Sequence, residues 1–266
     1  MTVYLGKNPV GVGRIVEKKV AKTKFGCSVD NFIGDVDTDG EYVEPSGTFE
    51  VNLDGVKSIY LSSLNSRFFS NKGIKKFIAN DLVKINSSCF ADFAYSASNL
   101  EEVHIDSLEI VDETAVFSNA FSYCYNLKTA TFAKLKKVAG VRAFEYCFRG
   151  LFLNAEEVFP ALEEISENLA FQNVFNFTAN SVITLPKVKK ITGTTASYNS
   201  TFGSFYVQNT VWNFPSATEF TGYIWNVGAS YAGEIHFAAA NREAIEACDG
   251  YANKWGFAGA SLFFDL

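Results

Sequence analysis

The chain has 266 residues, of which 48% are hydrophobic and 20% charged, an ordinary composition for a soluble globular protein. Its formal net charge of −6 argues against nucleic acid as a partner. No run of about eighteen apolar residues is present, which argues against a helix that crosses a membrane. The unusual feature is the content of 26 Phe against one Met, because so many rings need a regular place to be buried.

Residues 1–52 are rich in Gly, Val and Asp and lack the pattern that governs the rest of the chain. Stretches such as VGRIVEKKVAKTKF and EPSGTFEVNLDG predict short strands joined by turns, so we expect a small β-rich module or cap. The beginning of the chain does not have the charged, then apolar, then small layout of a secretory signal. Three explanations stay open: the protein is kept in the cytoplasm, it leaves by another route such as lysis, or its start has been trimmed.

The acidic run GDVDTDGEYVE lies within this segment. Asp35, Asp37 and Asp39, followed by a glycine, match the first half of the D-x-D-x-D-G calcium loop. The twelfth position holds Ser46 instead of glutamate, and the proline before it argues against an exiting helix. We therefore predict a polar turn between two strands, with calcium binding as the alternative.

Residues 53–237 repeat with one period. Segments of the form aliphatic, two mostly charged residues, aliphatic end at Ile59, Ile85, Val111, Val138, Ile165, Ile191 and Phe220, in steps of 26, 26, 27, 27, 26 and 29 residues. Short strand-like runs end with the same spacing at Ile78, Ile105, Phe132, Phe159, Leu185, Phe214 and Phe237. Pairs of rings lie between these landmarks: Phe90 and Phe93, Phe117 and Phe121, Phe144 and Phe148, Phe171 and Phe175. Three landmarks with one period predict a solenoid of stacked repeats of about 26 residues.

Alternation within each strand predicts which side chains face the core. The inward pairs are Val103 with Ile105, Ala130 with Phe132, Ile183 with Leu185, and Trp212 with Phe214. The paired phenylalanines then fill the interior. In NAEEVFP the same alternation would turn Glu157 inward, so we expect a deletion or bulge to shift the register there.

The five cysteines include no CxxC pair, and several have aromatic neighbours, as in SCFADF, SYCYNL and EYCFRG. They are Cys27, Cys89, Cys124, Cys147 and Cys248. This setting predicts buried, reduced thiols that act as small apolar groups, with a catalytic or metal-binding cysteine as the alternative.

Residues 238–266 no longer repeat. NREAIEACDGYANKWG places Ile245, Cys248 and Trp255 at helical spacing, with Asn241 as a candidate N-cap. The predicted strands EIHF and SLFFDL lie on either side of it. We expect a short α/β cap that closes one end of the stack.

The sequence offers few groups for catalysis. Its two histidines, His104 and His236, lie five repeats apart and both should point outward, so no joint site is expected. Glu102, His104 and Asp106 share one face of a strand, but neighbours there are about 6.6 Å apart, too far for one metal ion. Charge pairs such as those at 136–137, 163–164 and 189–190 recur at one repeat position with either sign, which indicates solvated turns. We expect no catalytic, cofactor or metal site.

The remaining candidate is the outward row beside the strand-ending landmarks. Its members are His104, Thr131, Val158, Thr184, Asn213 and His236. The row is mostly small and polar without strong charge, and solenoids bind partners on such concave faces. We expect it to suit a glycan or a protein partner better than DNA.

The segments AFEYCF and LEEISENLAFQNVF resemble the BspA-like leucine-rich repeats of bacterial surface and secreted proteins. The family order of strand, Pro, aliphatic, Ala-Phe and Cys is similar to NAFSYCYNLKTATF, and the likeness covers roughly residues 53–237. VYLGKNPVGV, EYVEPSGTFEV and ANREAIEACDGYANKWG also resemble phage-encoded and prophage repeat proteins of gut bacteria. Several repeats lack the proline, and no cell-wall anchor is visible.

The resemblance implies a right-handed leucine-rich-repeat solenoid with no enzymatic activity. It also implies adhesion: binding of a cell-surface glycan or protein, at the cell surface or in a virion. The alternative is a structural spacer or tail-associated component of a phage-like particle, docked through residues 1–52.

Overall fold

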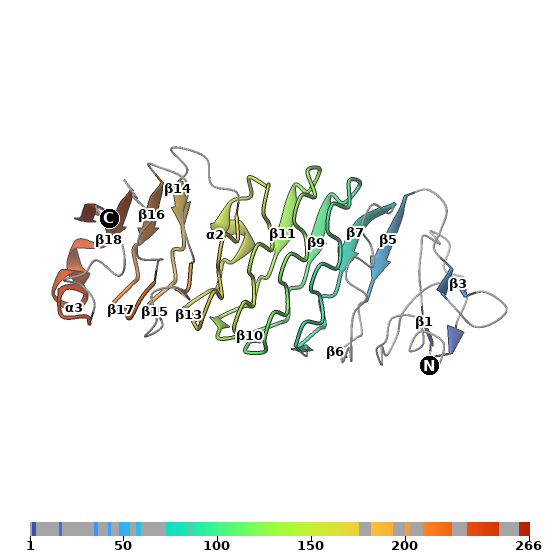
Figure 1. Ribbon diagram of the computed structural model, residues 1–266, viewed down its shortest axis with the longest axis horizontal. Helices are drawn as coiled ribbons and strands as arrows, with labels where there is room; N and C mark the ends of the chain where they lie inside the picture. Colours follow the sequence, from blue (N-terminus) through green and yellow to red (C-terminus); the bar gives the residue numbers. More distant parts are fainter. Residues whose placement is uncertain are drawn as a thin grey trace.

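The structure is a computed structural model, and Figure 1 shows its turns stacked along one long axis. It describes residues 2–3, 16–17, 35–36, 42–43, 48–53, 57–59, 73–85, 87–175, 182–193, 200–202, 210–224, 233–249 and 261–266. The described turns form a β-solenoid of about six turns with about 27 residues in each repeat. The predicted repeat architecture is confirmed at this level.

The first side of each turn is a short parallel strand. Strands β5, β7, β9 and β11 form one four-stranded sheet, and β14, β16, β18 and β19 form another. Their bounds are Phe49–Asn52, Ile74–Ile78, Glu102–His104, Thr129–Thr131, Val182–Thr184, Val211–Phe214, Glu234–Phe237 and Ser261–Phe264. Lys76 lies opposite Glu102, and Glu102 lies opposite Thr129, so equivalent residues are one repeat apart.

The second side carries the aliphatic landmarks. Its strands are β6 (Ser58–Ile59), β8 (Lys84–Ile85), β10 (Ile110–Val111), β12 (Lys137–Val138), β13 (Glu164–Ser166), β15 (Lys190–Thr192) and β17 (Glu219–Thr221). The paired landmarks are Ile59 with Ile85, Val111 with Val138, Val138 with Ile165, Ile165 with Ile191, and Ile191 with Phe220. Strands β8 and β10 belong to different sheets, so this side is interrupted between them.

The third side is an arc of turns. Along this arc, every second backbone N–H donates to a backbone carbonyl of the following turn. Phe90 N–H, for example, donates to the Val116 carbonyl at 2.8 Å. The backbone N–H groups between them donate to the carbonyl three residues earlier and so form local turns. Phe93 N–H, for example, donates to the Phe90 carbonyl at 3.1 Å. Residues at positive φ recur at equivalent places: Ser88, Asp92 and Ser96; Ala115, Asn119 and Tyr123; Arg142, Tyr146 and Gly150. The two hydrogen-bond patterns together fix a backbone that L-residues rarely adopt.

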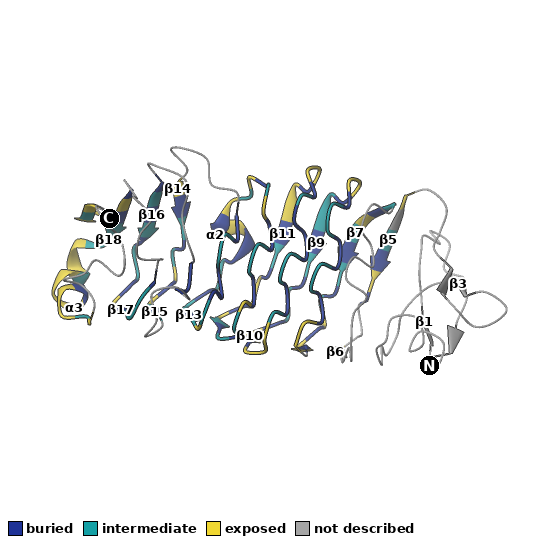
Figure 2. Cartoon of the chain, viewed as in Figure 1, coloured by how far each residue is buried: buried dark blue, intermediate teal, exposed yellow. Residues whose placement is uncertain are grey.

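The core lies inside the stack and is filled by the predicted rings. All eight paired phenylalanines are buried, as are all eight predicted inward strand residues. Phe90, Phe117 and Phe144 stack from turn to turn, with ring centroids 5.3 and 4.9 Å apart. Figure 2 shows the buried residues running along the turns and the exposed ones gathered at the loops. The large phenylalanine content is therefore accounted for by a continuous aromatic core.

The segment NAEEVFP does not form the predicted strand. Residues 155–158 form a single helical turn, α2 (Ala155–Val158), which separates the two sheets of the first side. The Asn154 side chain accepts a hydrogen bond from the Glu156 N–H at 3.1 Å and so caps this turn. Helical spacing buries Ala155 and Val158 while Glu157 stays exposed, so no carboxylate enters the core. The prediction that a deletion or bulge shifts a strand there is wrong, since the strand is replaced by a helical turn.

Some strands lie outside the predicted solenoid range. β1 (Thr2–Val3) pairs with β2 (Val16–Glu17), and β3 (Asp35–Val36) pairs with β4 (Tyr42–Val43), both antiparallel. The predicted strands on either side of the acidic turn are therefore present, while Asp37 and Asp39 lie outside the described residues. β5 lies within predicted residues 1–52, yet it pairs with β7 and already belongs to the stack.

At the other end, the two predicted strands are β18 and β19, which pair in parallel. Between them lie the 3₁₀ turn η2 (Ala239–Asn241) and α3 (Arg242–Glu246). Asn241 occupies the N-cap position, but its side chain makes no capping bond and donates instead to the Pro215 carbonyl at 3.2 Å. Ile245 is buried as expected, and Trp255 lies outside the described residues.

Candidate binding surfaces

The predicted outward row is divided by α2 into two groups. His104 and Thr131 lie on the sheet of β9 and β11, and the remaining polar members lie on the sheet of β14, β16 and β18. Those remaining members are Thr184, Asn213 and His236, and all five polar residues of the row are half-buried. Val158 does not face outward as predicted: it is buried, because the helical turn α2 directs it into the core.

His104 takes part in a chain of hydrogen bonds across two turns. Its Nδ1 lies 3.0 Å from the Thr131 hydroxyl, and its Nε2 lies 3.2 Å from Glu102 Oε2. The same hydroxyl donates to Asp106 Oδ1 at 2.7 Å. The Glu102 carboxylate also pairs with Lys76, and that contact together with the His104 bond holds the pKa of Glu102 below its ordinary value. The three groups that share this face are therefore linked in one chain: Glu102 contacts His104, and both His104 and Asp106 contact the Thr131 hydroxyl.

His236 has a similar setting at the far end. Its Nδ1 lies 2.7 Å from Asp265 Oδ1, its Nε2 lies 3.0 Å from Glu234 Oε2, and its ring stacks on Phe263. Asn213 Nδ2 donates to the Thr184 hydroxyl at 3.2 Å. Many polar groups of the row thus bond to one another across turns, which leaves fewer of them for a ligand.

The charged landmarks form ion pairs between successive turns. The pairs are Lys136 with Glu109, Lys137 with Glu164, Lys189 with Glu163, and Lys190 with Glu219, at 2.8–3.0 Å. The bond from Lys189 holds the pKa of Glu163 below its ordinary value. Repeat positions that carry either sign are therefore complementary partners, which supports a structural role for them.

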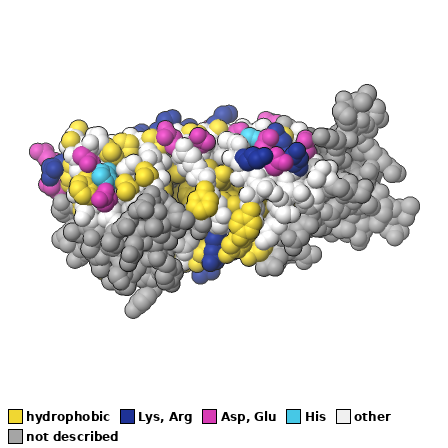
Figure 3. Space-filling view, turned by 90° about the horizontal axis from the view of Figure 1, so that it is seen from above, with side chains coloured by type: hydrophobic (Ala, Val, Ile, Leu, Met, Phe, Trp, Pro, Cys, Tyr) yellow, Lys and Arg dark blue, Asp and Glu magenta, His cyan; other side chains and the backbone are white. Residues whose placement is uncertain are grey.

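A cluster of exposed and half-buried rings lies at the edge where the arc meets the loop before the next strand. We call it the aromatic–arginine patch. Its members are Tyr95, Tyr123, Tyr125, Tyr146 and Arg149, which contact one another, and Phe152, which occupies the position of Tyr125 on the next turn. Tyr125 is 73% exposed and Phe152 is 74% exposed. Tyr123 meets Tyr95 edge to face, with ring centroids 5.5 Å apart, and lies 6.1 Å from Tyr125. Figure 3 shows hydrophobic side chains gathered with basic ones over the middle of the stack.

Arg149 lies between rings from two turns. Its guanidinium carbon is 5.5 Å from the Tyr123 ring centroid and 5.1 Å from that of Tyr146. Both distances fit cation–π contacts, in which a guanidinium is held flat against an aromatic face. Within the described ranges, no carboxylate forms an ion pair with Arg149, whereas Arg142 and Arg242 have glutamate partners.

Two tyrosines of the patch adopt backbone conformations that favour smaller residues. Tyr123 has φ 59° where equivalent positions hold Ser96 and Gly150, and Tyr146 has φ 54° where they hold Asp92 and Asn119. A non-glycine residue in this region costs about 1–2 kcal/mol. Gly150, at φ 85°, also leaves room for the Tyr123 ring, because a Cβ there would lie 2.9 Å from its Cδ1. The backbone conformations of Tyr123 and Tyr146 therefore carry a free-energy cost.

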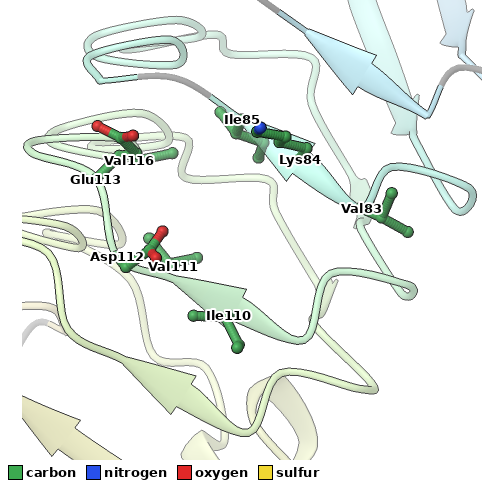
Figure 4. A pocket seen from close by; sticks show the side chains of 8 residues that line it. All are labelled: Val83, Lys84, Ile85, Ile110, Val111, Asp112, Glu113 and Val116. Atoms are coloured by element: carbon green, nitrogen blue, oxygen red, sulfur yellow. The ribbon is translucent and has the colours of Figure 1, made fainter.

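A groove opens where the second side is interrupted (Figure 4). It has a volume of about 360 Å³ and lies between β8 and β10. Val83 and Ile110 are 56% and 51% exposed at this groove. Its polar lining consists of Lys84, Asp112 and Glu113, with no histidine, cysteine or serine. The groove has apolar walls and a charged rim, but it lacks a nucleophile with an adjacent base.

The described cysteines are reduced, and three of the four are buried, as predicted. They are Cys89, Cys124 and Cys147, with Cys248 only partly exposed; Cys27 lies outside the described residues. Burial raises the pKa of the Cys124 thiol to about 12 and also raises the pKa of Cys147. A thiol that stays protonated is a poor nucleophile and a poor metal ligand.

The prediction from sequence missed the aromatic–arginine patch, although a signal for it was present. In SYCYNL and EYCFRGLF, tyrosines adjoin Cys124 and Cys147, which face the core. The signal is the residue type, because tyrosine is less often fully buried than phenylalanine: Tyr123 and Tyr146 are half-buried and Tyr125 is exposed, whereas Phe148 is buried. What the sequence could not show was that rings from two turns meet around one arginine.

Among the described residues, no helix is long and apolar enough to cross a membrane, and no group of three or more potential metal ligands gathers. No family model, curated protein or solved structure matches this chain.

Proposed function

We propose that this chain is a non-catalytic binding protein that recognises a glycan or protein on a cell surface. The observation that carries the proposal is the aromatic–arginine patch. It exposes large rings together with a guanidinium that has no carboxylate partner in the described structure. Tyrosine and arginine are enriched among the residues that dominate binding energy. Tyrosine buries a large area at low conformational cost, and arginine presents a planar fork of N–H donors.

The patch fits a binding role better than a role in stability. Phe152 and Tyr125 keep about three quarters of their surface exposed, so they contribute little to the core. The backbones of Tyr123 and Tyr146 carry a conformational cost that smaller residues would reduce. Large exposed rings grouped on one surface are expected where they contact a partner.

The resemblance of the repeats to BspA-like leucine-rich repeats supports the same proposal. Repeat proteins of bacterial surfaces and of phages use a stack of turns as a rigid support for contact residues. Membership of that family, and an origin in a phage, prophage or gut bacterium, are part of the proposal.

The test is binding of the purified full-length protein to a glycan array and to intact gut-bacterial cells. The variant Tyr125→Ala/Phe152→Ala removes the two most exposed rings of the patch. We expect saturable binding by the unchanged protein and at least a tenfold weaker affinity for the variant, the factor typical when an interface anchor is truncated.

The matched control is Val83→Ala/Ile110→Ala, which removes two exposed apolar side chains at the groove instead. Alanine at His104, Thr131, Thr184, Asn213 and His236 tests the outward row. Binding that survives the patch variant but is lost in one of the other two would move the site to that surface. The absence of binding to any cell or glycan would contradict the proposal.

A structural spacer is the second candidate. The observation that favours it is the elongated stack, with β1 at one end and β19 at the other (Figure 1). Deletion of residues 1–47 would leave β5 in the sheet and remove the candidate docking segment. Loss of self-association on this deletion, measured by light scattering, together with the absence of ligand binding, would favour the spacer.

A further inference from the structure

We propose that the aromatic–arginine patch recognises an acidic saccharide, with Arg149 binding its carboxylate or sulfate and the exposed rings packing against the sugar faces. This inference rests on the proposed function and names the ligand class of the same site. It differs from the sequence-based expectation, which placed the site on the strand face around His104 and Thr131.

The Arg149 guanidinium is the group that would bind the anion. Arginine stays charged and presents several N–H donors in a planar fork that matches a carboxylate or sulfate. In the described structure the other patch members are aromatic, and Arg149 makes no ion pair with a carboxylate. Its guanidinium is held between Tyr123 and Tyr146, so its orientation is set before a ligand arrives. This restraint reduces the entropy lost on binding.

The exposed rings of the patch are the surface on which a sugar would pack. Pyranose rings have a polar rim and flat faces of C–H groups, and those faces pack on aromatic rings whose π faces are electron-rich. Tyr125 and Phe152 offer such rings at 73% and 74% exposure, at equivalent positions of adjacent turns, and Phe152 lies on the same turn as Arg149. One polar side chain lies next to Tyr125: Asn126 is exposed and donates through Nδ2 to the Ser98 carbonyl at 2.6 Å. Rings, a fixed cation and an amide together suit the mixed surface of an acidic sugar.

The size of the patch favours a saccharide over a protein partner. A standard protein interface uses about 20–30 residues on each side and buries anchors in pockets. The patch has six residues on three adjacent turns, and its two most exposed rings project into solvent. A ligand of a few sugar units matches an area of this size, so the observations favour a saccharide.

The experiment uses the full-length protein and an array that presents sialylated, uronate-containing and sulfated glycans beside their neutral parent glycans. Hits are measured in solution by calorimetry. We expect the acidic member of a pair to bind about tenfold more tightly than the neutral one, the factor expected for hydrogen bonds to a charged group. Arg149→Gln should abolish that preference, while Arg149→Lys should keep part of it, because lysine retains the charge but not the fork.

Tyr125→Ala/Phe152→Ala should instead weaken acidic and neutral members alike. The control is Arg242→Gln, since Arg242 also lies over a ring, that of Phe264 at 4.4 Å, but is paired with Glu246. This variant should bind like the unchanged protein. Circular dichroism of every variant checks that the fold is kept.

Several outcomes would overturn the inference. They are equal binding of acidic and neutral glycans, equal losses in Arg149→Gln and Arg242→Gln, or no binding to any acidic glycan. If cells are bound through the patch but protease treatment of the cells removes binding, the partner is a protein, and the proposed function stands while this inference fails. If neither cells nor glycans are bound, both fail.

Discussion

Left-handed backbone at ordinary residues is the most unusual feature at the residue scale. Eleven non-glycine residues have positive φ in the described structure, including Ala115, Arg142 and Leu169. They persist because hydrogen bonds to the next turn and within the local turn fix the same backbone. The cost at each position is offset by the regularity of the stack as a whole.

The same backbone conformation predicts opposite changes in the free energy of unfolding for substitutions at Ala115 and Gly150. Ala115→Gly removes a Cβ from a residue at φ 53° and should raise the free energy of unfolding by up to about 1 kcal/mol. Gly150→Ala should lower it, because φ is 85° and the new Cβ would lie 2.9 Å from Tyr123 Cδ1. Urea unfolding of both variants measures the difference. A stabilising Gly150→Ala would contradict the assigned backbone.

The cysteines should differ in their reactivity. The thiolate is the reacting species, and burial raises the pKa of Cys124 to about 12. Among the four described cysteines of the native protein, we expect iodoacetamide at pH 8 to modify Cys248 first and to leave Cys89, Cys124 and Cys147 unmodified. Peptide mass spectrometry identifies the modified residues, and unfolding in urea should expose all of them. Rapid native labelling of Cys124 would show that its turn opens.

Glu145 should reduce stability at neutral pH. Burial raises its pKa, against the opposing effects of Arg142 and a hydrogen bond from Ser118. The folded protein therefore binds this proton more tightly than the unfolded chain, so stability falls as pH rises from the ordinary value of 4.5 through the raised one. Glu145→Gln should remove that decrease and match or exceed the parent Tm at pH 7. A lower Tm at pH 7 would show that the charge stabilises the turn.

At the scale of elements, the strands are too short to be stable alone, and contacts between turns hold them. Strands of two or three residues on the second side pair through landmark residues, and charged neighbours form ion pairs across the same steps. Exposed pairs of this kind contribute about 0.2–1 kcal/mol each. The register is set by the inward landmarks, because a slip of one residue would turn Val138 or Ile165 out of the core. The ion pairs add attraction between neighbouring turns.

Charge reversal tests the attraction between Lys137 and Glu164. Lys137→Glu would put a carboxylate beside Glu164, where the present contact is 2.9 Å, and should lower stability by about 0.5–1 kcal/mol. Adding Glu164→Lys should restore most of the loss, and thermal unfolding of the four proteins closes the double-mutant cycle. A loss in the double variant equal to the sum of the two single losses would exclude a direct interaction.

For the whole molecule, stability depends on contacts between neighbouring turns. Each turn packs mainly on the turns before and after it, so a central turn has two stabilising interfaces and a terminal turn has one. The aromatic core runs through all of them without a break between Phe90 and Phe171. Loss of a central ring should therefore weaken both neighbours.

Phe144→Ala is the corresponding substitution. Its ring lies 4.9–5.5 Å from those of Phe117, Phe132, Phe159 and Phe171. We expect a loss of about 3–5 kcal/mol and faster amide exchange in the turns on both sides. Hydrogen exchange with mass spectrometry gives the spatial pattern. Faster exchange confined to the turn of residue 144 would mean that the turns unfold independently.

The sequence by itself determined the repeat, its register and its core. Landmarks such as Val138 and Ile165 pair as predicted, because a strand in a stack must repeat its inward residues at every turn. It could not determine the departures from this pattern. Val158 turns inward because an Asn-capped helical turn buries it at lower cost than a strand that would bury Glu157.

The candidate site also depended on tertiary structure. The sequence shows tyrosines beside inward cysteines, but the distances that join Tyr123, Arg149 and Tyr146 arise when turns 27 residues apart are stacked. Likewise, polar residues of the outward row look available in the sequence, yet His104 and Thr131 bond to each other. Periodicity along the chain fixes which residues face outward, whereas contacts between turns decide which of them remain available to a partner.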